Sequence, residues 1–255
     1  MKTFVRFLYI LSLTAFGVAC GGGGGGSVVI SPVDQAIGGA WVGNDSTGLE
    51  IFGLSTESGR IHWVIPSTGE QGFGTAFVNG TAVTINYTYV APLGFVLADG
   101  SSSAICTATG TIRERQSLAV TTNCTTDMGL AFSSTASLNY DSLYDRDSSL
   151  SVIAGNYDDF GLVLNIAANG VIFEQDPASG CIINGQVSII DSAFNAYDVS
   201  MTFSNCVGNA AILNGVTFTG LCILDNTVTP EQLTVGMTGA VSGVTYSVVV
   251  TLPRL

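Results

Sequence analysis

Basic side chains are scarce in this chain of 255 residues. Lys2 is the only lysine, and six arginines complete the basic set. Nucleic acids and anionic membrane surfaces are bound mainly through lysine and arginine. The sequence therefore predicts that neither nucleic acid nor an anionic lipid surface is a partner.

Histidine is rarer still, because His62 is the only one. One histidine cannot build a histidine-rich metal site. His62 stands beside Trp63 in an apolar stretch, which favours a packed or surface role over that of a catalytic base. The chain also lacks any nucleotide, haem or flavin signature, so no cofactor is expected.

Charged residues make up only 10% of the chain, whereas 47% of the residues are hydrophobic. This balance excludes intrinsic disorder, which combines low hydrophobicity with high charge. Runs of valine, isoleucine, threonine and aromatic residues are broken by glycine, asparagine and aspartate. Such runs predict many short strands joined by tight turns. No long stretch has a helical period, so an all-β fold is expected.

The first residues are typical of a secretory signal peptide. Lys2 and Arg6 precede an apolar stretch over 7–16, which is shorter than the about 20 residues that a bilayer-spanning helix needs. A positive start, a short apolar core and small residues before a cut site define a signal peptide. We expect residues 1–19 to be removed after export.

The four residues from Gly17 to Cys20, Gly-Val-Ala-Cys, resemble the lipobox of bacterial lipoproteins, in which leucine is preferred where this chain has Gly17. The resemblance implies cleavage before Cys20 and attachment of lipid, including palmitate, to its thiol. Two or more lipid chains give stable membrane attachment, and lipoproteins of this type carry three. Gly21 replaces the aspartate that retains such proteins in the inner membrane, which implies the outer membrane.

A run of six glycines over 21–26 follows the cysteine. Glycine chains are flexible, and six residues reach roughly 13 Å. Residues 20–30 are therefore predicted to be a tether between the lipid and the folded part. The alternative is an ordinary signal peptide cut nearby, with Cys20 left as a plain thiol. After cleavage, five arginines face 19 acidic residues, a net charge of −14.

The folded part is interpreted as one unit written twice, because short motifs recur in the same order. The pairs are 39–41 with 155–157, 48–49 with 161–162, 58–61 with 169–172, 106–112 with 181–187, 123–124 with 205–206, and 129–131 with 220–222. We expect a first β unit over 31–136, an ordered linker over 137–150 and a second β unit over 151–255. The first unit is expected to carry an additional hairpin within 73–97. One or two helical turns are expected in 31–37 and in 148–153.

The repeat also suggests how the cysteines pair. With Cys20 lipidated, five cysteines remain, so one stays unpaired. The matching positions predict the disulfides Cys106–Cys124 and Cys181–Cys206 in the oxidising cell envelope, with Cys222 as a free, packed thiol. The rival pairing Cys206–Cys222 remains open.

Two tandem antiparallel units of about 100 residues, each barrel-like or a small sandwich, fit this number of strands. Each unit begins with Gly-x-Trp or Gly-x-Tyr after a short segment, which resembles the opening motif of lipocalin-type barrels. The whole layout resembles two-repeat lipoproteins of gammaproteobacteria, a resemblance that implies no activity.

Clustered acids are the remaining candidates for chemistry. Asp145 and Asp147 in the linker are weak candidates for a calcium site, although the spacing fits no known calcium loop. Asp158 and Asp159 form a second cluster. Solvated loop residues are the simpler interpretation of both.

Three functions are therefore open. The expected one is a non-enzymatic, lipid-anchored envelope protein that binds a small apolar ligand, an envelope component or a protein partner. A purely structural lipoprotein with filled barrels is the second. A hydrolase that uses Asp or Glu residues of the first unit is the third. A roomy apolar interior would favour ligand binding, because eight-stranded barrels either are filled or hold one ligand.

The substitution Cys20→Ala is expected to abolish labelling by palmitate and to release the protein from the membrane fraction. The reason is that the lipobox resemblance places lipid on this thiol alone. Metabolic labelling and fractionation measure both effects, and Cys222→Ala is the matched control. Labelling that persists in Cys20→Ala would refute the anchor.

Overall fold

The computed structural model describes residues 33–255. Residues 1–32 lie outside the described residues, and with them the predicted signal peptide (1–19) and the predicted tether (20–30) that begins at Cys20. Among 33–255, no helix is long and apolar enough to cross a bilayer. The all-β prediction is confirmed, since sixteen strands account for almost all regular structure.

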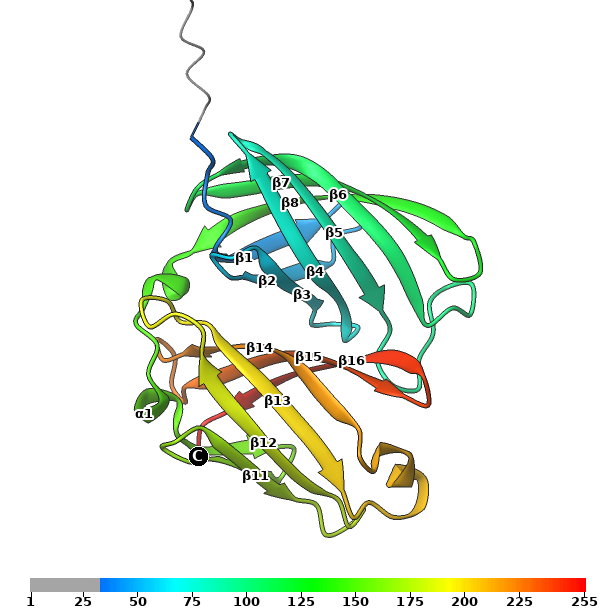
Figure 1. Cartoon of the computed structure of the whole chain (residues 1–255), viewed down its shortest axis with the longest axis vertical. Helices are drawn as coiled ribbons and strands as arrows, with labels where there is room; N and C mark the ends of the chain where they lie inside the picture. The colour runs from blue at the N-terminus through cyan, green and yellow to red at the C-terminus, as the bar shows by residue number, and fades with distance from the viewer. Residues whose placement is uncertain (1–32) are drawn as a thin grey trace, which may run out of the picture. The chain divides into compact units, whose positions relative to one another are not determined.

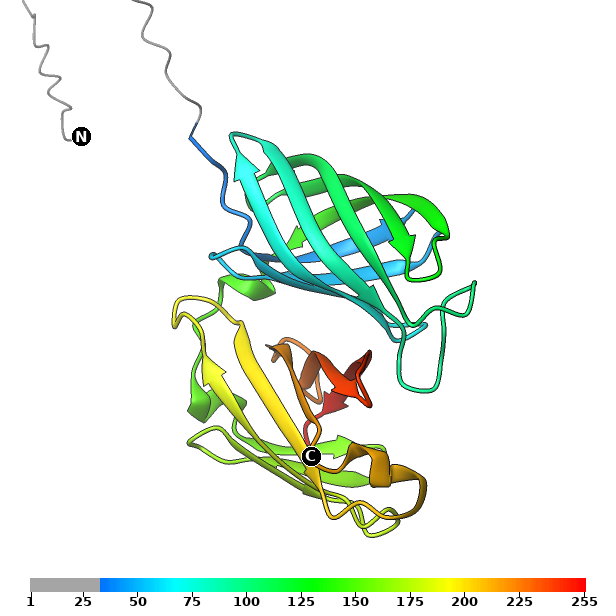
Figure 2. The same ribbon diagram turned by 45° about the vertical axis from the view of Figure 1, so that its right-hand side comes forward.

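The first eight strands form a closed antiparallel barrel (Figures 1 and 2). They are β1 (Gly39–Asp45), β2 (Glu50–Ser55), β3 (Arg60–Ile65), β4 (Glu70–Asn79), β5 (Ala82–Val90), β6 (Ser103–Arg113), β7 (Ser117–Thr126) and β8 (Ala131–Asp141). Each strand pairs with the next, and β1 pairs with β8 through partners such as Trp41 and Tyr140. β8 therefore continues past residue 136 because its last residues pair with β1.

Two short helices follow β8, namely the 3₁₀-helix η1 (Ser142–Asp145) and α1 (Leu150–Ile153). The turn expected in 148–153 is thus present. The turn expected in 31–37 is absent from its described part, residues 33–37. There the backbone N–H of Gln35 donates to Gly80 O, and that of Ala36 donates to Glu114 Oε2. These bonds to two turns of the barrel replace helical ones.

The last eight strands form a second antiparallel sheet in the same consecutive order. They are β9 (Gly155–Asp159), β10 (Leu162–Ile166), β11 (Val171–Gln175), β12 (Ile182–Ile189), β13 (Tyr197–Ser204), β14 (Thr217–Asp225), β15 (Gln232–Val241) and β16 (Val244–Pro253), with the 3₁₀-helix η2 (Gly208–Leu213) between β13 and β14. This sheet curves without closing (Figure 2). β9 meets the end of β16 only at the Tyr157–Arg254 bridge and through a bond from Leu255 N to Asn156 O.

The two sheets begin in the same way. Trp41 Nε1 donates to the carbonyl of Ile37, and Tyr157 Oη donates to the carbonyl of Ile153. In both cases a buried aromatic residue on the first strand holds the carbonyl four residues earlier. The motif that marks each opening in the sequence therefore fixes the chain entry to its sheet.

The additional hairpin expected within 73–97 of the first unit corresponds to β4 and β5, which pair with each other and have no counterpart between β11 and β12. Both sheets nevertheless have eight strands, because β15 and β16 follow the last matched motif of the second unit. Cys106 and Cys124 face each other on the sixth and seventh strands of the barrel. Cys181 and Cys206 flank the fourth and fifth strands of the second sheet, so the two bridges differ in topological position.

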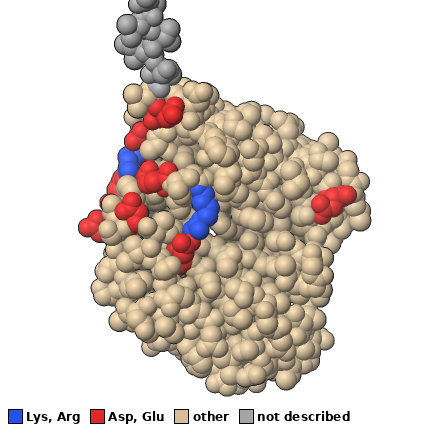
Figure 3. Space-filling model, viewed as in Figure 1, with Lys and Arg blue, Asp and Glu red and all other residues tan. Residues whose placement is uncertain are grey.

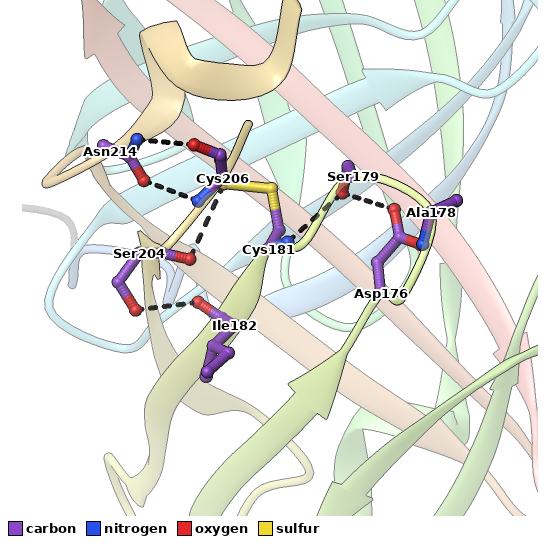
Figure 4. The surroundings of a disulfide bond; sticks show 8 residues. All are labelled: Asp176, Ala178, Ser179, Cys181, Ile182, Ser204, Cys206 and Asn214. Atoms are coloured by element: carbon purple, nitrogen blue, oxygen red, sulfur yellow. Dashed lines mark hydrogen bonds between the residues drawn. A yellow bond between two sulfur atoms is a disulfide. The ribbon is translucent and has the colours of Figure 1, made fainter. Parts of the chain in front are cut away.

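Both disulfides join the partners that the repeat indicated, Cys106–Cys124 and Cys181–Cys206. Figure 4 shows the second one among its neighbours. Asn214 accepts a hydrogen bond from the backbone N–H of Cys206 at 2.8 Å and donates to its carbonyl at 2.9 Å. The side chain of Asn214 thereby ties the loop after β13 to the bridge, and Cys222 is left free and buried.

Residues of both sheets share a third apolar cluster. It contains Leu54 of β2, Leu221 of β14 and Tyr144 of η1, and Tyr144 stacks on Phe194 at 4.9 Å. A further bond runs from Ser247 Oγ of β16 to Gly69 O in the β3–β4 turn, at 2.6 Å. The outer walls of the two sheets therefore bury apolar surface against each other.

The mature protein is expected to expose no reactive thiol until it unfolds. Cys222 is 1% exposed, and burial raises the pKa of its thiol, which suppresses the reactive thiolate. Titration with Ellman's reagent should detect no thiol in the native protein and one in guanidinium without reductant. Cys222→Ser should remove that one. Detection of three thiols would contradict the two disulfides, and detection of two would contradict lipidation of Cys20.

Candidate functional site

The barrel interior contains an apolar cavity of about 330 Å³. Its wall is built from the loop end of β1 and β2, the end of β3, and the adjoining parts of β4, β5, β7 and β8. The lining residues are Asp45, Thr47, Leu49, Ile51, Trp63, Val64, Ile65, Gly72, Tyr87, Tyr89, Val120, Thr122, Cys124, Phe132, Ser133, Ser134 and Ala136. Ligand pockets in proteins span roughly 300–1,000 Å³, so the cavity has the size of a small-ligand site.

Strand alternation places these side chains inside. β7 has the strict pattern of a half-buried strand, with Leu118, Val120, Thr122 and Cys124 buried and their neighbours exposed. The inward residues near the Leu118 end are large and fill the barrel together with Trp41. Toward the other end, the residue of β8 that pairs with Val120 is the small Ala136, which leaves space in the interior. The barrel is therefore filled at one end and hollow at the other.

Gly72 is needed for the shape of the cavity. A Cβ atom at this position would lie 2.1 Å from Trp63 Nε1 and 2.8 Å from a ring carbon of Tyr87. Only glycine lets the Trp63 ring lie flat along β4. Trp63 then meets Tyr87 edge to face, with 5.0 Å between ring centroids. The two rings form one wall of the cavity.

Few polar groups reach the cavity, and most are engaged. Tyr87 Oη donates to Thr122 Oγ1 at 3.4 Å, and burial raises the pKa of Tyr87 to about 12. Tyr89 Oη donates to Glu70 Oε2 at 2.8 Å. Both tyrosines thus stay neutral at physiological pH. The site offers aromatic surface and hydroxyl groups.

The mouth of the cavity lies at the end where β1 turns into β2. Asp45, Thr47 and Leu49 line it on that side, and Phe132 lines it from β8. Phe132 is partly exposed and meets Tyr89 edge to face, with 6.3 Å between centroids. The chain enters the barrel at the opposite end, where Gln35 bonds to the β4–β5 turn at Gly80. The mouth and the point where the chain enters the barrel therefore lie at opposite ends of the barrel.

The two linker aspartates do not form a site. Asp145 is paired with Arg115 and also accepts a hydrogen bond from Tyr140 Oη at 2.7 Å. Asp147 is exposed. Within residues 33–255, no group of three or more His, Cys, Asp or Glu side chains is arranged to hold a metal ion. The charge that calcium would need on Asp145 is already neutralised by an arginine.

His62 lies on β3, outside the cavity lining. Its Nδ1 is 2.5 Å from Gln71 Nε2, and its ring stacks on Phe73. Burial first, and then the charge of Arg60, lower the pKa of His62 to about 4. A neutral, packed imidazole is what the sequence favoured over a catalytic base.

One unusual group escaped the sequence reasoning. Glu174 on β11 is 1% exposed and points to the inner side of the second sheet, like Ile172. It shares a hydrogen bond with Asp159, and its Oε2 has no partner among the described residues. Burial, and then the charge of Asp159, raise the pKa of Glu174 to about 7. The alternating pattern of 171–175 contained the signal, because glutamate occupies an inward position there.

The interior of the second sheet is otherwise filled by large side chains. Tyr157, Tyr197 and Phe218 are almost fully buried, together with Leu164, Ile166 and Ile172. Arg254 closes the end of this core, since its Nη2 donates to Tyr157 Oη at 2.7 Å and its Nη1 pairs with Glu231 at 2.6 Å. The two sheets thus share a strand order and differ in what fills them.

Replacing Glu174 by glutamine is expected to stabilise the protein at alkaline pH. The pKa of Glu174 is raised on folding, so the stability of the protonated form is present below pH 4.5 and is lost as the pH rises through about 7. Glu174→Gln should add on the order of 1–2 kcal/mol near pH 8 and flatten the pH dependence of urea unfolding. Asp147→Asn, on an exposed carboxylate, should change neither. An unaltered pH profile in Glu174→Gln would contradict the buried pair.

Comparisons with known proteins assign the chain to no family. No family model matches it, and no curated protein matches it. Among solved structures it is similar to Aeromonas veronii immune modulator A, with 11% identity and a TM-score of 0.36, over 88% of this chain and 97% of that chain. A likeness of this extent identifies neither a family nor a function.

Proposed function

We propose that the protein is a non-enzymatic, lipid-anchored module of the cell envelope, and that its first barrel holds a small apolar ligand. The observation that carries the proposal is the cavity of about 330 Å³ inside a closed barrel. Its wall is mostly apolar and aromatic, and a few hydroxyl groups provide orientation. This combination is the usual composition of a small-molecule pocket.

Lipid on Cys20 would place the protein at the outer membrane, as expected from the signal peptide and lipobox. The tether would join the barrel beside the β4–β5 and β6–β7 turns, where Ala36 bonds to Glu114. The mouth of the cavity is at the opposite end of the barrel from these turns.

The filled second sheet favours a different task for that unit. Its interior holds Tyr157, Tyr197 and Phe218, which leaves aromatic side chains where a ligand would sit. A structural or protein-facing role for the second unit is therefore the second candidate. The hydrolase alternative gains little support from the first unit, because Asp45 is the only carboxyl group in the cavity lining and a paired-carboxylate hydrolase needs two.

The neutral fluorescent probe N-phenyl-1-naphthylamine tests the proposal. It should bind the mature protein, and Ala136→Phe should weaken that binding by about tenfold or more, because the new ring fills the cavity from β8. Ala119→Phe is the matched control, since Ala119 is the outward neighbour of Val120 on β7. Fluorescence titration measures the affinity, and circular dichroism checks folding.

The two tryptophans locate the probe. Trp63 lines the cavity, whereas Trp41 is buried in the filled end and donates to Ser55 Oγ at 3.0 Å. Probe binding should quench Trp63, so Trp63→Phe should remove the quenching and Trp41→Phe should keep it. Equal binding in all variants, or equal losses in Ala136→Phe and Ala119→Phe, would reject the cavity as the binding site.

A further inference from the structure

The mouth of the cavity carries negative charge and no positive charge. Asp45 lines it directly, and Glu70, the first residue of β4, lies two residues before the lining Gly72 and accepts a hydrogen bond from Tyr89. None of the arginines described in 33–255 belongs to the lining. Figure 3 shows that charged side chains are few on the face drawn there and that most of them gather on one side of it.

The arginines of the described residues lie outside the cavity lining, and three of them form ion pairs with other acidic residues. Arg60 pairs with Asp198, Arg115 with Asp145, and Arg254 with Glu231. Arg113 lies at the end of β6, and Arg146 lies after η1, both outside the lining. No cation of the folded chain is therefore in place to neutralise a carboxylate at the cavity mouth.

Asp45 is held in a fixed orientation by its own turn. Its Oδ1 accepts three hydrogen bonds: from Thr47 N at 2.8 Å, from Thr47 Oγ1 at 2.7 Å and from Leu49 N at 3.0 Å. Its Oδ2 takes part in none of these three bonds. One oxygen thus builds the β1–β2 turn, and the other is left for a group at the mouth.

Asp45 stays ionised at neutral pH. Burial raises the pKa of this carboxyl, but the hydrogen bonds from Thr47 and Leu49 together outweigh it and lower the pKa below its ordinary value. Its negative charge also reaches the cavity wall, where it contributes to the raised pKa of Tyr89. A fixed charge beside an apolar space acts more strongly on a ligand than the same charge in water.

We propose that the ligand of the first barrel is an apolar molecule with a cationic head, such as an alkyl or aryl amine, and that Asp45 is the residue that selects it. This inference rests on the proposed function. The apolar part would lie between Trp63, Tyr87 and Val120, and the ammonium group would meet Asp45 Oδ2. A fatty acid would instead bring its carboxylate against Asp45 without a compensating arginine.

Displacement of N-phenyl-1-naphthylamine by three molecules with the same chain tests the selectivity: octylamine, octanol and octanoate. On the mature protein near pH 7, octylamine should displace the probe at about a tenfold lower concentration than octanol, and octanoate should be weaker than octanol by a similar factor. Added salt should narrow both differences.

Asp45→Asn is the sharpest variant, because asparagine keeps the Oδ1 acceptor of the turn and loses the charge. It should lower the affinity for octylamine to that for octanol and leave octanol within about twofold. Glu50→Gln is the matched control. Glu50 begins β2 close to the same turn and is exposed, but it does not line the cavity, so the preference for the amine should survive.

The outcomes separate the two proposals. Absence of probe binding to the wild-type protein would overturn the proposed function itself. Probe binding with equal displacement by the three molecules, or with octanoate as the best, would overturn only the amine selectivity. The wild-type series decides this even if Asp45→Asn folds poorly. Persistence of the amine preference in a folded Asp45→Asn protein would remove Asp45 as the selecting residue.

Discussion

Closure of the first sheet is the constraint on which the rest of the structure depends. The pairing of β1 with β8 satisfies the backbone groups of both edge strands. A closed barrel keeps its shape through this continuous ladder, so part of its interior can stay hollow. The second sheet lacks such a ladder between β9 and β16, and its curvature depends on the side chains packed inside it. Closure therefore permits a cavity in one unit, and its absence requires a filled core in the other.

The cavity and its charge follow from a small number of local choices. Gly72 has no side chain that would collide with the Trp63 ring, and the small Ala136 leaves space in the cavity. The turn after β1 uses one oxygen of Asp45 and leaves the other at the mouth. The scarcity of basic residues leaves the mouth of the cavity without a cation among its lining residues. Apolar space and a single unbalanced charge together define the ligand chemistry that we propose.

The second unit shows how a similar strand order can be put to another use. Tyr157 repeats the anchoring role of Trp41, because each aromatic side chain bonds to the carbonyl four residues earlier. Beyond that start the units diverge, and the disulfides bridge different strands. The pair of Glu174 and Asp159 gives the second unit a carboxyl group whose pKa is raised to about 7.

The sequence by itself determined the all-β class and the cysteine partners, because strand-forming runs and motif order are local properties of the chain. It favoured a packed or surface role for His62 over that of a catalytic base, and the structure decides for packing against Gln71 and Phe73. It did not determine the strand count of each unit. The second unit has no counterpart of β4 and β5, but two further strands, β15 and β16, bring its count to eight. Only the tertiary structure decided that the barrel closes, that one end is hollow and that Asp45 stands at its mouth. Those features depend on how the volumes and charges of side chains from six or more strands add up in space, which no single stretch of sequence contains.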